Sequence, residues 1–269
     1  MTLLYSTPSI LLLAIAIVVV VAGACGGQIY IHRHFRSADF VQHNEVGGFI
    51  ISVVGTLYAV MLGFLTVVVW QQFADARQSV ALESAAAADA WHTSVGLPAM
   101  ARTKIRKDIL DYADDMVDRE WAEMRSGEFD KQADVFVMDA FAIAGGLIPV
   151  NQGEANAQAA TVQQLSVLHD YRQRRLASNR SGLPWFEWLV LFIGAVCVIC
   201  FCWLFGVENK RTHLLMTAVV TTLIVSMLVL LFELQYPFRS DIGIGPEIWT
   251  GTLEHIKFMQ MGGQMQMKM

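Results

Sequence analysis

Residues 47–70 read GGFIISVVGTLYAVMLGFLTVVVW, a run with no charged side chain and no proline. A helix needs about 20 consecutive apolar residues to cross the hydrocarbon core of a bilayer. Three other stretches, residues 8–30, 184–206 and 212–236, are comparably long and apolar, and their carboxylates lie toward the ends. The pattern predicts four transmembrane helices and therefore a polytopic membrane protein.

The composition of the chain supports a lipid bilayer as its first partner. Hydrophobic residues make up 55% of the chain, charged residues make up 16%, and the mean hydropathy is +0.45, which together depart from an ordinary soluble domain. The formal net charge is −5 and the sequence has no basic patch. Nucleic acid is therefore excluded as an expected partner.

The polar stretch between the second and third spans predicts a helical domain. Residues 71–183 are long enough to form a small core, and no proline or glycine interrupts the helical pattern between Phe64 and Val95. One helix should therefore cover residues 48–94 and reach beyond the bilayer. Further helices are expected at residues 99–125, 130–144 and 154–179. The predicted fold class is all-α.

The chain then divides into four expected parts. Residues 1–70 hold the first two spans, residues 71–183 the helical domain, residues 184–236 the last two spans, and residues 237–269 the remainder. Within that remainder we expect an amphipathic helix near residues 246–259 and a disordered tail at residues 261–269, which are rich in Met, Gln and Gly.

A row of carboxylates recurs at helical spacing in the second predicted helix of this domain. The row consists of Asp108, Asp111, Asp115 and Asp118. Such a row could bind a divalent cation or a partner, but it lacks the glycine-turned loop of an EF-hand, so a solvated helix face is the alternative. We predict no metal ligand set.

No catalytic constellation is present. The sequence has no glycine-rich phosphate loop, no G-x-S-x-G elbow and no H-E-x-x-H motif. We therefore expect neither an enzyme nor a bound cofactor.

The second span carries a seam of small or weakly polar residues on one side. The seam consists of Gly48, Ser52, Thr56, Ala59, Gly63 and Thr66, at spacings of three or four residues. In a membrane such a surface lets helices approach closely, which is one interpretation. The other is that the seam lines a pore around a symmetry axis, where an inorganic ion would pass.

Two carboxylates intrude into the spans. Glu187 lies near the start of the third span and Glu233 near the end of the fourth. Ionisable groups at membrane depth are costly and are often functional, although a position near the interface lowers the cost by snorkelling. Both interpretations stay open for each residue.

The short loops indicate the orientation of the chain. Arg33 and Arg36 follow the first span, while Lys210 and Arg211 join the third and fourth. Because positive charge in short loops marks the cytoplasmic side, we expect these four residues in the cytoplasm and the helical domain on the opposite side.

A set of residues spread along the chain resembles a known family. The set comprises Gly55, Leu57, Gly63, Trp70, Ala76, Arg77, Glu83, Glu120, Trp121, Asp170, Tyr171, Arg172, Arg174, Arg175, Leu176, Leu183, Pro184, Pro237, Phe238, Pro246 and Leu253. In combination it resembles the bacterial bestrophin-like domain family, which is distantly similar to bestrophin anion channels. The sequence departs from the family pattern at Gln235, where an acidic residue is expected, and at Ser240, where glycine is expected.

The resemblance implies a homo-oligomer of four-span subunits in the bacterial inner membrane, with the second span near the axis, that passes anions. Bestrophins place the helical region in the cytoplasm, opposite to the side that the loop charges predict. A second functional class also fits the residues: a membrane-anchored sensory or interaction protein whose helical domain binds a partner.

Overall fold

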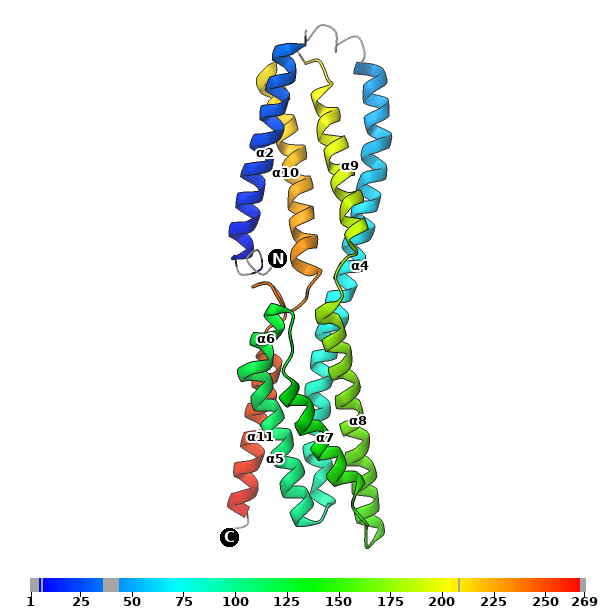
Figure 1. Ribbon diagram of the computed structural model, residues 1–269, viewed down its shortest axis with the longest axis vertical. Helices are drawn as coiled ribbons and strands as arrows, with labels where there is room; N and C mark the ends of the chain where they lie inside the picture. The colour runs from blue at the N-terminus through cyan, green and yellow to red at the C-terminus, as the bar shows by residue number, and fades with distance from the viewer. Residues whose placement is uncertain (1–4, 6, 36–43, 208, 267–269) are drawn as a thin grey trace. The chain divides into compact units, whose positions relative to one another are not determined.

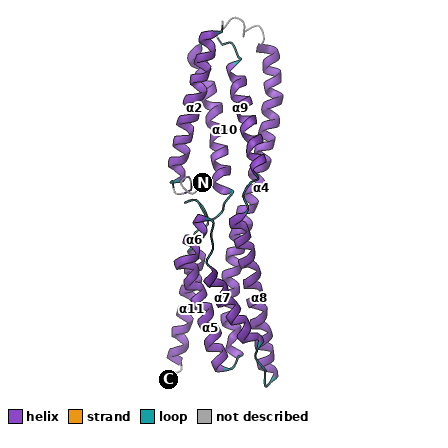
Figure 2. Cartoon of the chain, viewed as in Figure 1, coloured by secondary structure: helices purple, strands orange, loops and turns teal. Residues whose placement is uncertain are grey.

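The computed structural model describes residues 5, 7–35, 44–207 and 209–266, and every regular element in these ranges is a helix (Figure 2). The all-α prediction is confirmed. By its internal contacts the chain divides into two compact units. The first comprises Met1–Gln72, Gly182–Gln235 and Ser240–Ile242, and the second comprises Phe73–Ser181, Tyr236–Arg239 and Gly243–Met269.

Four helices are long and apolar enough to cross a membrane, as the sequence predicts. They are α2 (Ser9–His34), the first part of α4 (Asn44–Thr93), α9 (Trp185–Trp203) and α10 (Lys210–Leu234) (Figure 1). α2 packs along α10, and α9 contacts both. Only 6% of the most apolar window of α2 and 28% of that of α10 is buried, so most of this surface is left for lipid or for other chains.

α4 is one helix of 50 residues that passes Trp70 without a turn. It is followed by a 3₁₀ turn, Ser94–Gly96, and by Pro98, which precedes the next helix. The expected single helix over residues 48–94 is therefore confirmed, with its start four residues earlier. Its second half contains the run of alanines at residues 85–88, and alanine has the highest intrinsic helix propensity.

The second unit is a helical bundle with its own core. Besides the second half of α4 it contains α5 (Ala99–Asp115), α6 (Trp121–Ser126), α7 (Lys131–Gly145), α8 (Gln152–Arg180) and α11 (Glu247–Gln266). Two helices begin at side-chain caps: Asp130 accepts the Gln132 N–H at 2.8 Å, and Asn151 accepts the Glu154 N–H at 2.9 Å. Such caps satisfy donors that the first helical turn leaves unpaired.

α11 closes one side of this core against α5. Trp249 is fully buried and meets the Tyr112 ring edge to face, with 5.3 Å between the ring centroids. At the surface of the same pair of helices, Lys257 Nζ lies 2.9 Å from Asp114 Oδ1. The buried aromatic contact stabilises the pair more than the exposed ion pair does.

A π-helical turn, Met116–Glu120, joins α5 to α6. In an uninterrupted α-helix, at about 100° per residue, Trp121 would point roughly 140° away from Met116. The additional residue of the π turn rotates the following segment back by about 100°, so Met116, Trp121 and Met124 are all buried together. Gly127, in a left-handed conformation with φ 87°, ends α6.

The structure corrects one expectation about the C-terminal segment. The prediction of a disordered tail over residues 261–269 is wrong for residues 261–266, because α11 extends to Gln266. Met and Gln are good helix formers, so the segment continues the helix despite its glycines. Residues 267–269 and Arg36 lie outside the part of the chain that the structure describes.

Candidate functional site

The small-residue seam of α4 is uncovered in the isolated chain. Ser52, Thr56, Ala59 and Gly63 are exposed, while Gly48 and Thr66 are half-buried. A Cβ atom added at either seam glycine would meet no described atom within 4 Å. The surface is therefore free to approach another helix or to border a water-filled path.

The seam hydroxyls are bonded within their own helix. Ser52 Oγ donates to the Gly48 carbonyl at 2.7 Å, Thr56 Oγ1 to the Ser52 carbonyl at 2.7 Å, and Thr66 Oγ1 to the Leu62 carbonyl at 2.8 Å. Such back-bonding satisfies the hydroxyl without a partner from another helix. No charged side chain belongs to the seam, so the surface by itself selects neither sign of ion.

Another edge of α4 is packed. Tyr58, Leu62 and Val69 are buried. A Cβ atom at Gly194 of α9 would lie only 2.4 Å from the Tyr58 ring, so this glycine leaves the space that the ring occupies. α4 thus uses this edge within its own chain, and the seam lies beside it.

A third face of α4 carries large apolar side chains that are exposed. They are Phe49, Val53, Val60, Phe64 and Val67. With about 100° between successive residues, this apolar face adjoins the seam on the side away from the packed edge. α4 therefore presents two adjacent uncovered faces, one of small residues and one of bulky residues.

Glu233 is almost fully buried near the end of α10, at 2% exposure. Its Oε2 accepts a hydrogen bond of 2.8 Å from Ser9 Oγ, and Ser9 also bonds Asp241 through both its amide and its hydroxyl. The Glu233 carboxylate therefore contacts the first residue of α2 within the same chain, and a functional role for it stays a prediction. The hydrogen bond between Ser9 and Glu233 therefore connects the start of α2 to the end of α10.

Gln235 extends the same attachment. Its amide accepts from Trp188 Nε1 at 3.1 Å and donates to Tyr5 Oη at 3.1 Å, while Tyr5 Oη donates to the Phe232 carbonyl at 2.9 Å. A carboxylate cannot both accept and donate in this way when ionised. The departure from the expected acidic residue is therefore matched by the partners that surround it.

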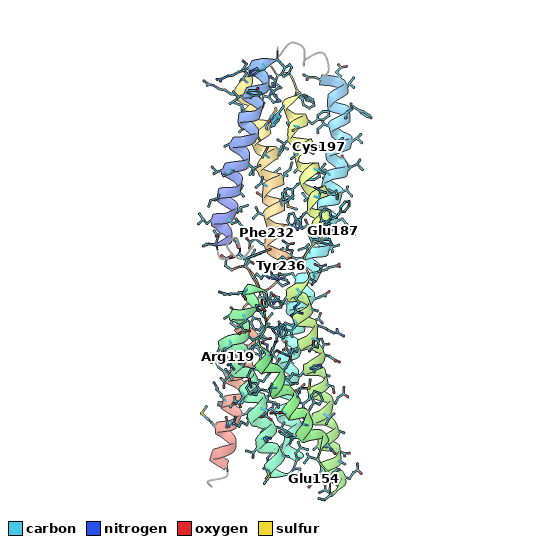
Figure 3. The ribbon with its side chains drawn as sticks, viewed as in Figure 1. Arg119, Glu154, Glu187, Cys197, Phe232 and Tyr236 are labelled. Carbon is cyan, nitrogen blue, oxygen red and sulfur yellow. The ribbon has the colours of Figure 1, made fainter. Side chains whose placement is uncertain are left out.

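Glu187 has a different environment, on the first turn of α9 (Figure 3). The side chain is half-buried, and the helix N-terminus favours a negative charge there. Its position is accounted for by the helix dipole, and it does not share the Ser9 contacts of Glu233.

The carboxylate row of α5 is not a uniform solvated face. Asp108 and Asp115 are buried, at 8% and 3% exposure, Asp111 pairs with Lys107, and Asp118 is exposed. The π turn begins directly after Asp115 and moves Asp118 off the row. In the described residues no group of three or more His, Cys, Asp or Glu side chains could share a metal ion.

Burial changes the acidity of this row. It raises the pKa of the Asp108 carboxyl above its ordinary value, and the nearby Asp139 carboxylate adds to the effect. Burial likewise raises the pKa of Asp115, with Asp130 contributing and the ion pair with Arg119 opposing.

The second unit also contains a buried charge network that was not predicted from the sequence. It comprises Glu83, Tyr112, Glu120, Arg172 and Arg175, all with essentially no exposure. Arg175 Nε lies 2.6 Å from Glu83 Oε2, and Arg172 Nη1 lies 2.9 Å from Glu120 Oε1. Glu120, from the π turn, also accepts from both Nη atoms of Arg175 at 3.2 Å.

The network is balanced in charge and in hydrogen bonds. Although burial by itself disfavours a charged guanidinium, the carboxylates of Glu83 and Glu120 hold the pKa of Arg175 above its ordinary value. Arg172 donates further to Asp134 Oδ1 at 2.7 Å and to the Asp130 carbonyl at 3.1 Å. The network therefore joins α4, α5, α7 and α8 through interactions that depend on every partner being present.

A signal for these arginines does exist in the sequence. Arg172 and Arg175 continue the helical spacing of Thr161, Leu165 and Leu168, all of them buried on α8. An arginine that occupies an apolar stripe is expected to be buried and paired, so the spacing alone indicates burial of Arg172 and Arg175.

These observations define an all-α membrane protein with four candidate spans and a second helical unit. The bestrophin-like domain model matches residues 18–248, so the chain belongs to the bestrophin-like family, and the resemblance stated from the sequence is confirmed. No curated protein matches the chain.

Solved structures agree on the fold. A crystal structure of a bacterial bestrophin homologue from Klebsiella pneumoniae, carrying one mutation, aligns with 91% of this chain and 98% of its own, with a TM-score of 0.68 and 13% identity. Another structure of a Klebsiella pneumoniae bestrophin homologue, phased with zinc, covers 89% of this chain and 96% of its own, with a TM-score of 0.66 and 14% identity. At this identity the likeness establishes the fold.

Proposed function

We propose that this protein is a homo-oligomeric ion channel in which α4 lines the symmetry axis. The observation that carries the proposal is the uncovered pair of adjacent faces on α4. In a ring of subunits, the helix nearest the axis has one face toward the axis and another toward a neighbouring subunit. A helix with a packed edge, a seam of small residues and an exposed apolar face meets this requirement.

Because the seam is uncharged, we infer the kind of ion from family membership. Membership of the bestrophin-like family supports an inorganic anion, and we take chloride as the representative ion. A path walled by hydroxyls, small residues and apolar side chains can gate by losing its water, because a narrow apolar section disfavours hydrated ions. We place the protein in the bacterial inner membrane as a multi-pass protein.

Flux and mass measured on the same preparation test the proposal. Liposomes that contain the purified protein and are loaded with potassium chloride should release chloride into a solution of an impermeant anion when valinomycin lets potassium leave with it. The protein in detergent should have a mass several times the 29.9 kDa of one chain. A monomeric mass together with the chloride leak of empty liposomes would refute the channel.

A membrane-anchored interaction protein is the second candidate. It is favoured by the exposed apolar side chains Val95, Met100, Ile148 and Val150, which lie in or beside the connecting turns of the second unit. Exposed apolar groups of this kind often mark contacts with another protein. This candidate predicts a specific protein partner and no ion flux, so the same liposome experiment separates the two.

A further inference from the structure

A polar pocket lies in the first unit between the end of α2 and the start of α10. Its volume is about 230 Å³, and Gln28, His32, Arg33, Lys210 and His213 supply its polar lining. The channel proposal makes no use of these residues, and none of them belongs to α4. The pocket is therefore a feature separate from the proposed ion path.

Positive charge borders this pocket. Arg33 and Lys210 are exposed, and neither forms an ion pair with any residue that the structure describes. α10 begins at Lys210, so the positive end of its helix dipole adds to the same region. Asp39 and Glu208, the carboxylates nearest in sequence, lie outside the described residues.

The two imidazoles are held in place. Nε2 of His32 lies 3.0 Å from the Trp203 carbonyl, and Nε2 of His213 lies 3.0 Å from the Cys202 carbonyl. A carbonyl oxygen can only accept, so both Nε2 atoms carry hydrogen and donate. The rings also meet edge to face, with 5.2 Å between their centroids. The pocket wall is therefore preorganised by the last turn of α9.

Gln28 supplies a second, independent observation. The residue is 3% exposed, it lines the pocket, and its Oε1 has no hydrogen-bond partner in the described part of the chain. A buried amide oxygen without a partner is costly, and a bound polar group would remove the cost. Because the two ends of an amide are interchanged by a flip, Gln28 can offer either its oxygen or its two N–H donors to a ligand.

We propose that this pocket binds a phosphate group, carried either by an anionic phospholipid headgroup or by inorganic phosphate. A guanidinium and an ammonium together match a multi-oxygen anion, and the volume exceeds what one monatomic ion would fill. The location fits a headgroup, since the pocket lies at the ends of two membrane-spanning helices. Ile29 and Leu214 line the same pocket and offer an apolar surface beside the charges.

The test uses the full chain in a zwitterionic detergent with two probes, phosphatidylglycerol and sodium phosphate, the latter compared with sodium chloride at equal ionic strength. Binding is measured as the rise of the melting temperature with probe concentration, which yields an apparent dissociation constant. The double variant Arg33→Gln/Lys210→Gln should weaken binding of the phosphate-bearing probe by about tenfold or more, because two charged donors are lost.

Arg211→Gln is the matched control, since Arg211 is an exposed cation that follows Lys210 in the first turn of α10 and does not line the pocket. It should change the dissociation constant by less than about twofold, as expected for a rim charge outside the site. The charge-preserving variant Arg33→Lys/Lys210→Arg should keep binding and shows that the altered positions still permit folding.

The outcomes separate the sources of the phosphate group. Binding of phosphatidylglycerol alone assigns the pocket to a lipid headgroup, and binding of both probes assigns it to the phosphate group whatever its source. The proposal is overturned if the wild-type protein binds neither probe, if the double variant binds as the wild type does, or if Arg211→Gln weakens binding equally. None of these results depends on ion conduction. The channel proposal is therefore tested separately, by the flux and mass measurements.

Discussion

Gly63 is the seam position at which a substitution reports on assembly rather than on folding. A Cβ atom there meets nothing within 4 Å in the single chain, so Gly63→Leu should leave the fold of one subunit intact. If another helix or a narrow pore crowds the seam, the leucine overpacks it at a cost of about 1–3 kcal/mol. A lower oligomer mass would indicate a packing seam, and an unchanged mass with reduced flux would indicate a pore.

Val67→Leu is the matched control for this experiment. Val67 is exposed on the neighbouring apolar face, where one more methylene should be tolerated with both mass and flux retained. Should Gly63→Leu also leave mass and flux unchanged, the seam faces lipid and neither interpretation of it is right.

Substitution of Arg175 is expected to lower the stability of the second unit more than substitution at most of its other positions. Arg175→Met would leave Glu83 and Glu120 buried without one of their cations, at a cost of about 3–5 kcal/mol in the free energy of unfolding. Thermal or denaturant unfolding in detergent measures the loss. Arg174→Met is the control, because that neighbour is exposed and should change stability by less than about 0.5 kcal/mol. Equal effects at the two positions would contradict the network.

Asp108 should make stability depend on pH. Because its pKa is raised in the folded chain, the folded state holds the proton more tightly than the unfolded state does. The charged carboxylate therefore costs stability above the folded pKa, and the cost disappears as the pH falls toward about 4, the ordinary range of an aspartate. Asp108→Asn should raise the melting temperature at neutral pH and leave it unchanged below pH about 4.

Asp118→Asn provides the comparison for Asp108→Asn, since Asp118 is exposed. It should shift stability by less than about 0.5 kcal/mol at either pH. A neutral-pH gain that persisted unchanged in acid would show that the effect of Asp108→Asn does not come from its charge.

Because the π turn adds one residue between α5 and α6, we expect a deletion within it to be tolerated. Deleting Asp118 from the turn would make Trp121 the fourth residue after Met116, which is the spacing of a regular α-helix face. The deletion should therefore keep Trp121 and Met124 buried and change stability by about 1 kcal/mol or less.

The matched deletion is that of Lys107, an exposed residue in the regular part of α5. Removing it rotates Ala101 and Ile105 away from the core by about 100°, at a cost of about 2–5 kcal/mol. Both deletions are compared by thermal unfolding monitored by circular dichroism. If the Asp118 deletion proved as harmful as the Lys107 deletion, the π turn would have a role other than keeping register.

The orientation of the chain in its membrane can be decided by labelling. The loop charges predict that the start of α10 faces the cytoplasm and that the second unit lies on the opposite side, whereas bestrophins imply the reverse. In a cysteine-free background, Ser126→Cys and Thr212→Cys place single thiols at exposed positions of these two regions. We expect Ser126→Cys to react with an impermeant reagent in intact spheroplasts, and Thr212→Cys only after permeabilisation. The reverse pattern would establish the bestrophin orientation.

The sequence was sufficient for the features that depend on local pattern. Hydrophobic runs of membrane-crossing length predicted the four spans, and uninterrupted helical patterning predicted the continuity of α4, because both follow from the residues of one segment. The combination of residues along the chain also indicated the bestrophin-like family.

The tertiary structure decided which side chains are covered, and by what. Glu233 and Asp108 are buried, Arg172 and Arg175 belong to a closed ion network, and one edge of α4 packs on Gly194 while the seam stays uncovered. The π turn that places Glu120 in that network gives no distinct spacing in the sequence. The physical reason is that burial and pairing depend on neighbours contributed by distant segments, which periodicity within one helix does not encode.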